Sequence, residues 1–118
     1  MTTNDQVTLQ RSQAGLRLIA QMTLYNSGNF ARLRTFIAES YAPALLETMS
    51  AGARLLGFRQ MRAAHGRLRV QQVLAADPYH VVVLMADEKA GALSLHDLEV
   101  EADYPHRILS YHAAPLDL

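Results

Sequence analysis

The spacing of hydrophobic residues changes at Gly66 from a helical repeat to an alternating one. Before this glycine, apolar residues recur three and four positions apart, which is typical of helices that bury one face. After it, apolar and polar residues alternate along four short segments joined by turn signals, which is typical of strands. Helices followed by strands predict an α+β fold, and we expect three N-terminal helices packed on a curved four-stranded antiparallel sheet.

Polar capping residues divide the N-terminal half into helices, because each can accept a hydrogen bond from the first helical turn that follows it. The caps are Ser12, Asn29 and Ser50. The expected helices cover residues 12–25, 29–41 and 50–65, and a short helical segment restarts after Pro43. Residues 1–11 are polar and are expected to form a flexible tail, which leaves residues 12–118 as one domain.

The first and last of these helices carry apolar residues on more than one side. The first has two apolar stripes, which predicts that it is covered on two sides. The stripes are Leu16, Ile19, Ala20 and Thr23, and Leu18, Met22 and Tyr25. The last helix mixes apolar residues with Arg54, Arg59 and Arg62, so we expect its outer side to meet carboxylates of the sheet or of a second subunit.

The strands are expected at residues 68–77, 79–86, 93–102 and 107–114, with close turns that indicate an antiparallel meander. In the third strand the apolar positions change parity, since Leu93 and Leu95 fall on one face and Leu98 and Val100 on the other. A β-bulge near His96 and Asp97 would bury both pairs, so we predict one there.

Composition limits the chemistry that the chain can perform. There is no cysteine among the 118 residues, which excludes disulfides, a thiol nucleophile and thiolate metal sites. No apolar run reaches the roughly 18 residues of a membrane span, so we expect no membrane partner and a cytoplasmic location. The basic first half and acidic second half give zero net charge, and mutual neutralisation is favoured over nucleic-acid binding.

Several segments resemble the nuclear transport factor 2-like superfamily, which includes SnoaL-like cyclases and ketosteroid isomerases. They are residues 25–30 (YNSGNF), residues 36–39 (FIAE) and the four C-terminal strands. Residues 59–62, 65–68 and 104–108 are also similar to a small domain of this superfamily that is attached to some serine hydrolases. The resemblance implies a cystatin-like cone, a pocket at its open end and dimerisation through the sheet.

The residues that carry the known reactions of that superfamily have no match in this chain. Gln21 stands where a ketosteroid isomerase would have its first-helix tyrosine, and residues 41–45 (YAPAL) offer no base aspartate. No Asp-Arg-Asp set of the epoxide-hydrolase kind can be matched, and the nearest alternative pairs Arg62 with Asp97. Isomerase and epoxide-hydrolase activities are therefore not expected.

Polar residues on the strands and helices supply the candidate site. The candidate acid–base groups are His96 and Asp97 at the expected bulge and His112 on the last strand. The candidate ligand contacts are Tyr25, Tyr41, Arg62, His96 and His112. Each also fits a structural role, such as a tyrosine with one hydrogen-bonded tip. The five histidines are scattered without metal-ligand spacing, so neither a metal nor a cofactor is expected.

The function expected from these observations is a non-catalytic small-molecule-binding or accessory interaction module, with a small apolar or anionic ligand. The alternative is a small isomerase, cyclase or hydrolase that uses His96, Asp97 or His112 in the pocket. The strand at residues 79–86 is apolar on both faces, and helices can cover only one of them. A homodimer through the sheet is therefore expected, with an interface at Tyr79, Val82, Val83 and Tyr111.

Overall fold

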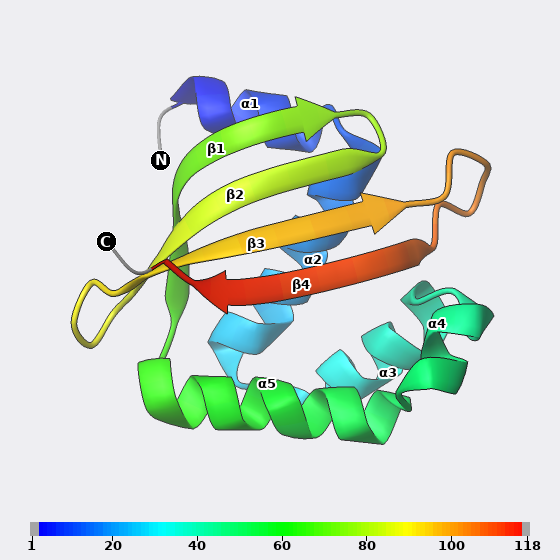
Figure 1. Cartoon of the computed structure of the whole chain (residues 1–118), viewed down its shortest axis with the longest axis horizontal. Coiled ribbons are helices and arrows are strands. Elements are labelled where there is room, and N and C mark those ends of the chain that lie inside the picture. Colours follow the sequence, from blue (N-terminus) through cyan, green and yellow to red (C-terminus); the bar gives the residue numbers. More distant parts are fainter. Residues whose placement is uncertain (1–2, 117–118) are drawn as a thin grey trace.

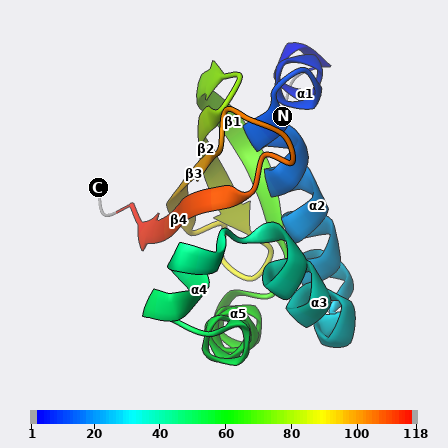
Figure 2. The same ribbon diagram turned by 90° about the vertical axis from the view of Figure 1, so that its right-hand side faces the viewer.

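A computed structural model describes residues 3–116 and shows an α+β fold with five helices and a four-stranded antiparallel open sheet (Figure 1). The helices are α1 (Thr3–Gln10), α2 (Gln13–Ser27), α3 (Phe30–Ser40), α4 (Pro43–Thr48) and α5 (Ala51–His65). The strands are β1 (Leu68–Asp77), β2 (His80–Asp87), β3 (Leu93–Val100) and β4 (Ile108–Pro115), in the order β1-β2-β3-β4. The helices lie on one side of the sheet (Figure 2), and we call the face toward them the inner face.

The expected helix caps form as the sequence predicts. The side chains of Ser12, Asn29 and Ser50 each accept a hydrogen bond from the backbone N–H three residues later. Gly28 and Gly66 follow α2 and α5, both with a φ of 71°. Glycine adopts a positive φ without the steric cost that a Cβ would add, which explains why the two helices stop where they do.

The segment expected to be a flexible tail is instead largely helical, and this expectation is corrected for residues 3–10; residues 1 and 2 lie outside the described part. Helix α1 buries Leu9, whose exposed fraction is 1%. Its backbone packs closely on α2 at Gly15, where a Cβ would lie only 2.1 Å from the Leu9 carbonyl oxygen. One buried apolar residue and the close approach at Gly15 therefore hold a helix whose other apolar residue, Val7, is exposed.

Helix α2 is buried along one of its two expected stripes. Leu18, Met22 and Tyr25 lie in the core, with Tyr25 fully buried. Leu16 and Ile19 are exposed over 46% and 36% of their surface, so the expectation that α2 is covered on two sides is wrong. The helix contacts the sheet, α1, α3 and α5 with its inner side, and its outer side faces solvent.

Two arginines of α5 bind backbone carbonyls at the ends of other helices, and the third, Arg59, lies over the Phe30 ring at 4.9 Å, so within the described residues none shows the carboxylate pairing that we expected. Arg62 donates to the carbonyl oxygens of Tyr25 and Asn26 near the end of α2. Arg54 donates to the carbonyl of Leu45 in α4. The last carbonyls of a helix lack intrahelical partners and carry its partial negative charge, which makes them good acceptors for a guanidinium group.

The register between β2 and β3 is unbroken, so the predicted bulge at His96 and Asp97 is wrong. The irregularities lie within β1 and between β3 and β4 at Glu99 and Val100. Leu98 therefore faces the inner side with its exposed fraction at 0%, while Leu93 and Leu95 stay half-buried on the outer face. Because β3 alternates without a bulge, Ser94 and His96 lie on the inner face together with Leu98. The change in the spacing of apolar residues therefore marks two inward polar residues, not a bulge.

Candidate functional site: a cleft between helix α5 and the sheet

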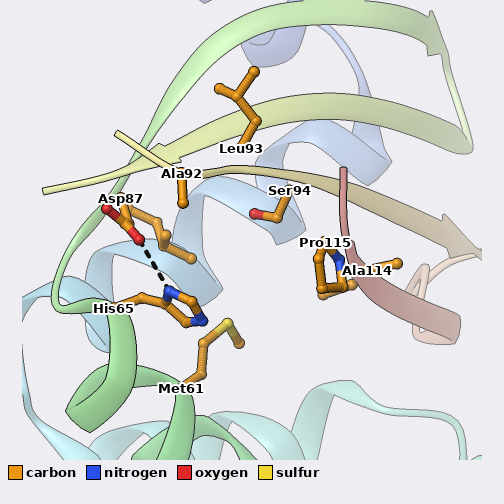
Figure 3. Close-up of a pocket in the computed structure, with 10 residues that line it drawn as sticks. Met61, His65, Asp87, Ala92, Leu93, Ser94, Ala114 and Pro115 are labelled. Atoms are coloured by element: carbon orange, nitrogen blue, oxygen red, sulfur yellow. Dashed lines mark hydrogen bonds and ion pairs between the residues drawn. The ribbon is translucent and has the colours of Figure 1, made fainter. Parts of the chain in front are cut away.

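Two adjoining cavities lie between α5 and strands β3 and β4. The larger has a volume of about 660 Å³ and the smaller about 250 Å³. Met61 of α5 and Ala113 of β4 line both cavities, so the two follow each other along the same cleft. The smaller cavity, shown in Figure 3, extends toward the end of α5 at His65.

The larger cavity has mainly apolar and aromatic walls. Phe58 of α5 stacks on Tyr111 of β4, with 5.9 Å between the ring centroids. Tyr41 forms another wall, and the Arg54 guanidinium lies over its ring at 5.3 Å. Leu45 and further side chains of α4 and α5 also line the cavity, which is open to solvent. Such a space, with a few polar groups among apolar walls, is typical of small-molecule sites.

His96 joins the two cavities through a buried hydrogen-bonded chain. Its Nδ1 lies 2.7 Å from the Tyr111 hydroxyl, and its Nε2 lies 2.8 Å from Ser94 Oγ. Burial lowers the pKa of His96 to about 4, so the ring is neutral near pH 7 and has one donor and one acceptor nitrogen. One of the two hydroxyls then donates to the ring, and the other keeps its proton for a different acceptor. Ser94 lines the smaller cavity and Tyr111 the larger.

The other two tyrosines proposed as ligand contacts are anchored inside the protein. Tyr25 donates its hydroxyl proton to the Gly66 carbonyl at 2.7 Å, and burial raises its pKa to about 12. Tyr41 donates to Gln21 Oε1 at 2.5 Å, and burial raises its pKa as well. Tyr25 therefore ties α2 to the turn before β1, whereas Tyr41 also presents its ring to the larger cavity.

The remaining candidates do not assemble into one site. Arg62 binds the end of α2, and Asp97 lies on the outer face, where its Oδ1 is 2.7 Å from His80 Nε2. His112 is an exposed residue at the rim of the larger cavity. Of the three proposed acid–base groups, only His96 is inside the cleft, and Arg62 does not meet Asp97.

The four residues expected at a dimer interface also lie on different surfaces. Val82 is half-buried on the outer face, but Val83 has an exposed fraction of 0% and packs in the core. Tyr111 faces the cleft, and Tyr79 lies at the β1–β2 turn with its ring stacked on His106 at 5.8 Å. Val83 has no surface for a partner in this fold, because its position in β2 points toward the helices.

A histidine–aspartate pair that the sequence did not indicate lies at the smaller cavity. His65 Nδ1 lies 2.9 Å from Asp87 Oδ2 (Figure 3). The Asp87 side chain is only 3% exposed, and the His65 side chain is 48% exposed. The backbone N–H of Ala90 and the His65 ring lower the pKa of Asp87 and keep it ionised. The pairing of Leu68 with Asp87 brings the carboxylate to the end of α5, and no local sequence pattern reveals that register.

Ser94 was missed for a different reason, and for it a signal was present. Once the register continues without a bulge, the outward positions of Leu93 and Leu95 require Ser94 and His96 to face inward. Two polar residues at positions i and i+2 that alternate with the outward Leu93 and Leu95 therefore indicate a polar patch on the inner face.

Comparisons with protein-family models, with curated proteins and with solved structures found no match to this chain. Among the helices within residues 3–116, none is both long and apolar enough to cross a membrane. In the same part of the chain, no group of three or more histidine, aspartate or glutamate side chains is placed to hold a metal ion.

Proposed function

We propose that this protein binds a small, mainly apolar molecule in the larger cavity between α5 and β4. The observation that carries the proposal is a cavity of about 660 Å³ with aromatic and aliphatic walls and few polar groups. Ligand sites in proteins usually enclose about 300–1,000 Å³ and combine apolar walls with a few orienting polar groups. Tyr111 supplies such a group, because its hydroxyl is held beside the cavity by His96.

A binding role accounts for the candidate residues better than an enzyme that uses His96, Asp97 and His112. Such an enzyme needs titrating groups that converge on one substrate atom. Asp97 is on the outer face, and His96 is a neutral ring with both nitrogens hydrogen-bonded to hydroxyls. His96 therefore fits a structural network beside the cavities, His112 lies at the rim of the larger cavity, and Asp97 lies outside both.

We also propose that the domain is a cystatin-like cone of the nuclear transport factor 2-like superfamily. The order of elements supports this proposal, since helices precede an antiparallel meander and a cavity lies between the sheet and α5. A homodimer through the outer face is part of the same proposal. It is supported by half-buried apolar side chains on the side of the sheet that the helices leave bare, namely Val82, Leu84, Leu93 and Leu95 (Figure 2).

The ligand-binding proposal can be tested at Gly57, which lines the larger cavity from the middle of α5. A Cβ at this position meets no atom within 4 Å, so Gly57→Ala leaves the cavity open and Gly57→Phe fills it. Titration with the neutral fluorescent probe N-phenyl-1-naphthylamine should give equal affinity for wild type and Gly57→Ala. Gly57→Phe should bind at least about tenfold more weakly, a loss of about 1.4 kcal/mol. Equal affinity for all three proteins would contradict the proposed site.

The dimer can be tested at Val82. A charge on a face buried between subunits loses its hydration without a partner, so Val82→Glu should give a monomer in native mass spectrometry. Leu16→Glu, a change at an exposed position of α2, is the matched control and should leave the dimer intact. A monomeric wild type, or an unchanged dimer with Val82→Glu, would contradict the interface.

A further inference from the structure

We propose that His65 and Asp87 form a general acid–base pair that activates water for the hydrolysis of small neutral esters in the smaller cavity. This inference goes beyond ligand binding, and it concerns a different histidine from those that the sequence suggested. His65 and Asp87 both line the cavity, and Ser94 lines it from β3 (Figure 3).

The hydrogen bond between His65 and Asp87 fixes the tautomer of the imidazole. An ionised carboxylate can only accept a hydrogen bond, so His65 Nδ1 carries the proton and donates to Asp87 Oδ2 at 2.9 Å. In the neutral ring, Nε2 is then left with a lone pair that can accept a proton. A buried carboxylate that orients an imidazole in this way is the arrangement by which hydrolases present a base to a nucleophile.

The Asp87 carboxylate is itself held firmly in place. Its Oδ1 accepts a hydrogen bond of 2.7 Å from the Ala90 N–H, and its side chain is almost completely buried. His65 is the last residue of α5, so its backbone is set by the helix and the Gly66 cap. A rigid base with a half-exposed ring is accessible to water and to a small substrate.

The chain from Tyr111 through His96 to Ser94 supplies a hydrogen-bond donor at the same cavity. Burial raises the pKa of Tyr111, so its hydroxyl remains protonated and can donate to His96 Nδ1. In the tautomer set by that donation, His96 Nε2–H donates to Ser94 Oγ, and the Ser94 proton is free to point into the smaller cavity; in the other tautomer Ser94 donates to Nε2. A preorganised hydroxyl of this kind can stabilise the oxyanion that forms when an ester carbonyl is attacked.

Ser94 is less suited to be the nucleophile. Its neighbouring base would be His96, which is fully buried and bonded to two neutral hydroxyls. A proton taken up by that ring would be an unpaired buried charge, which is unfavourable. Water is therefore assigned as the nucleophile and His65 as its base.

The proposed reaction balances without a further reactant. His65 Nε2 accepts a proton from water while the water oxygen bonds to the carbonyl carbon, and the carbonyl oxygen becomes an oxyanion beside Ser94. When the intermediate collapses, the C–O bond to the leaving alcohol breaks, and His65 Nε2–H returns the proton to that alcohol. One ester and one water molecule give one carboxylic acid and one alcohol.

The chain contains a natural control for this assignment. His80 and Asp97 form a second pair of the same residue types, at 2.7 Å, on the outer face of the sheet. Both of their side chains are more than 40% exposed, and neither lines the described cavities of the cleft. If any exposed histidine could produce the activity, His80 would contribute as much as His65 in the Val82→Glu background, where the proposed dimer does not cover the outer face.

The test is release of p-nitrophenolate from p-nitrophenyl acetate by the whole protein. Loss of the base in His65→Gln should lower kcat/KM at least about 100-fold, the lower end of the usual general-base contribution. His80→Gln should leave kcat/KM unchanged. Imidazole added to His65→Ala should restore part of the rate after the hydrolysis caused by the same imidazole without protein is subtracted, and it should give no such gain with His80→Gln.

Asp87 is a positioning residue, because it acts through His65 and does not touch the ester. Asp87→Asn should therefore lower kcat while KM stays within about twofold of the wild-type value. Circular dichroism checks that each variant is folded, and if Asp87→Asn unfolds, the His65 variants and the imidazole rescue still decide the question.

Two outcomes would overturn the inference. One is a wild-type rate no higher than that of His65→Gln, and the other is an equal loss in His65→Gln and His80→Gln. Binding of N-phenyl-1-naphthylamine without His65-dependent hydrolysis would overturn the inference and leave the ligand-binding proposal intact. Hydrolysis that depends on His65 without probe binding would support the inference and contradict the ligand-binding proposal.

Discussion

Acid should destabilise this protein through the buried imidazole of His96. Burial lowers the pKa of His96 to about 4 in the folded protein, compared with an ordinary value of about 6.5 in an unfolded chain. Between these two values the unfolded chain binds a proton that the folded protein does not. The free energy of unfolding therefore falls as the pH drops from about 6.5 to about 4.

The magnitude follows from the two pKa values. At pH 7 the ring is almost entirely neutral in both states, so the His96 contribution is close to zero. At pH 4.5 the His96 ring is mostly protonated in the unfolded chain and mostly neutral in the folded protein. This difference reduces the free energy of unfolding by roughly 2 kcal/mol. This is a large fraction of the stability of a typical small domain.

Urea unfolding followed by circular dichroism at pH 7 and pH 4.5 measures the effect. The comparison is between wild type and His96→Gln, because glutamine can still donate to one neighbour and accept from the other. The carboxylates and the other histidines titrate in both proteins. Their contributions to the change in the free energy of unfolding therefore cancel when the two proteins are compared. The wild type should lose roughly 2 kcal/mol more than His96→Gln between the two pH values.

A second control is His112→Gln, which removes an exposed histidine of β4 and should behave as the wild type does. The reasoning is refuted if wild type and His96→Gln lose the same stability on acidification. It is also refuted if the imidazole of His96, followed by NMR, titrates near 6.5 instead of near 4.

Two glycine-to-alanine substitutions in helices should change stability in opposite directions. Gly57→Ala should raise the free energy of unfolding by about 1 kcal/mol, because alanine is the better helix former and its Cβ meets no atom within 4 Å. Gly15→Ala should lower it by roughly 2 kcal/mol, because its Cβ would lie 2.1 Å from the Leu9 carbonyl oxygen and α1 would have to move. Urea unfolding measures both, and a stabilised Gly15→Ala would show that α1 does not pack on α2 as described.

Helix ends could be predicted from the sequence because their chemistry is local. Ser12, Asn29 and Ser50 each cap the helix that follows, as expected, and Gly28 and Gly66 end α2 and α5. Each of these signals involves a side chain and backbone groups within about one helical turn. The strands and their antiparallel order were predicted for a similar reason, since short turns join neighbouring segments.

Helix α1 shows where local reasoning fails. Its composition predicts little helical stability, and its position depends on Leu9 reaching the core and on close backbone contact at Gly15. The burial of one α2 stripe instead of two has a similar origin. Which side of a helix is covered depends on elements far away in the sequence, and the apolar pattern alone shows only which sides could be covered.

The sequence by itself determined the α+β class, the helix caps, the four strands and the absence of cysteine chemistry. Only the tertiary structure decided which polar groups meet. His65 and Asp87 are 22 residues apart, and they come together because the β1–β2 register places Asp87 opposite Leu68, just beyond the Gly66 turn. A shift of one residue would turn alternate side chains to the other face of the sheet. The cleft therefore depends on strand register, which is set by packing across the whole domain and not by local sequence.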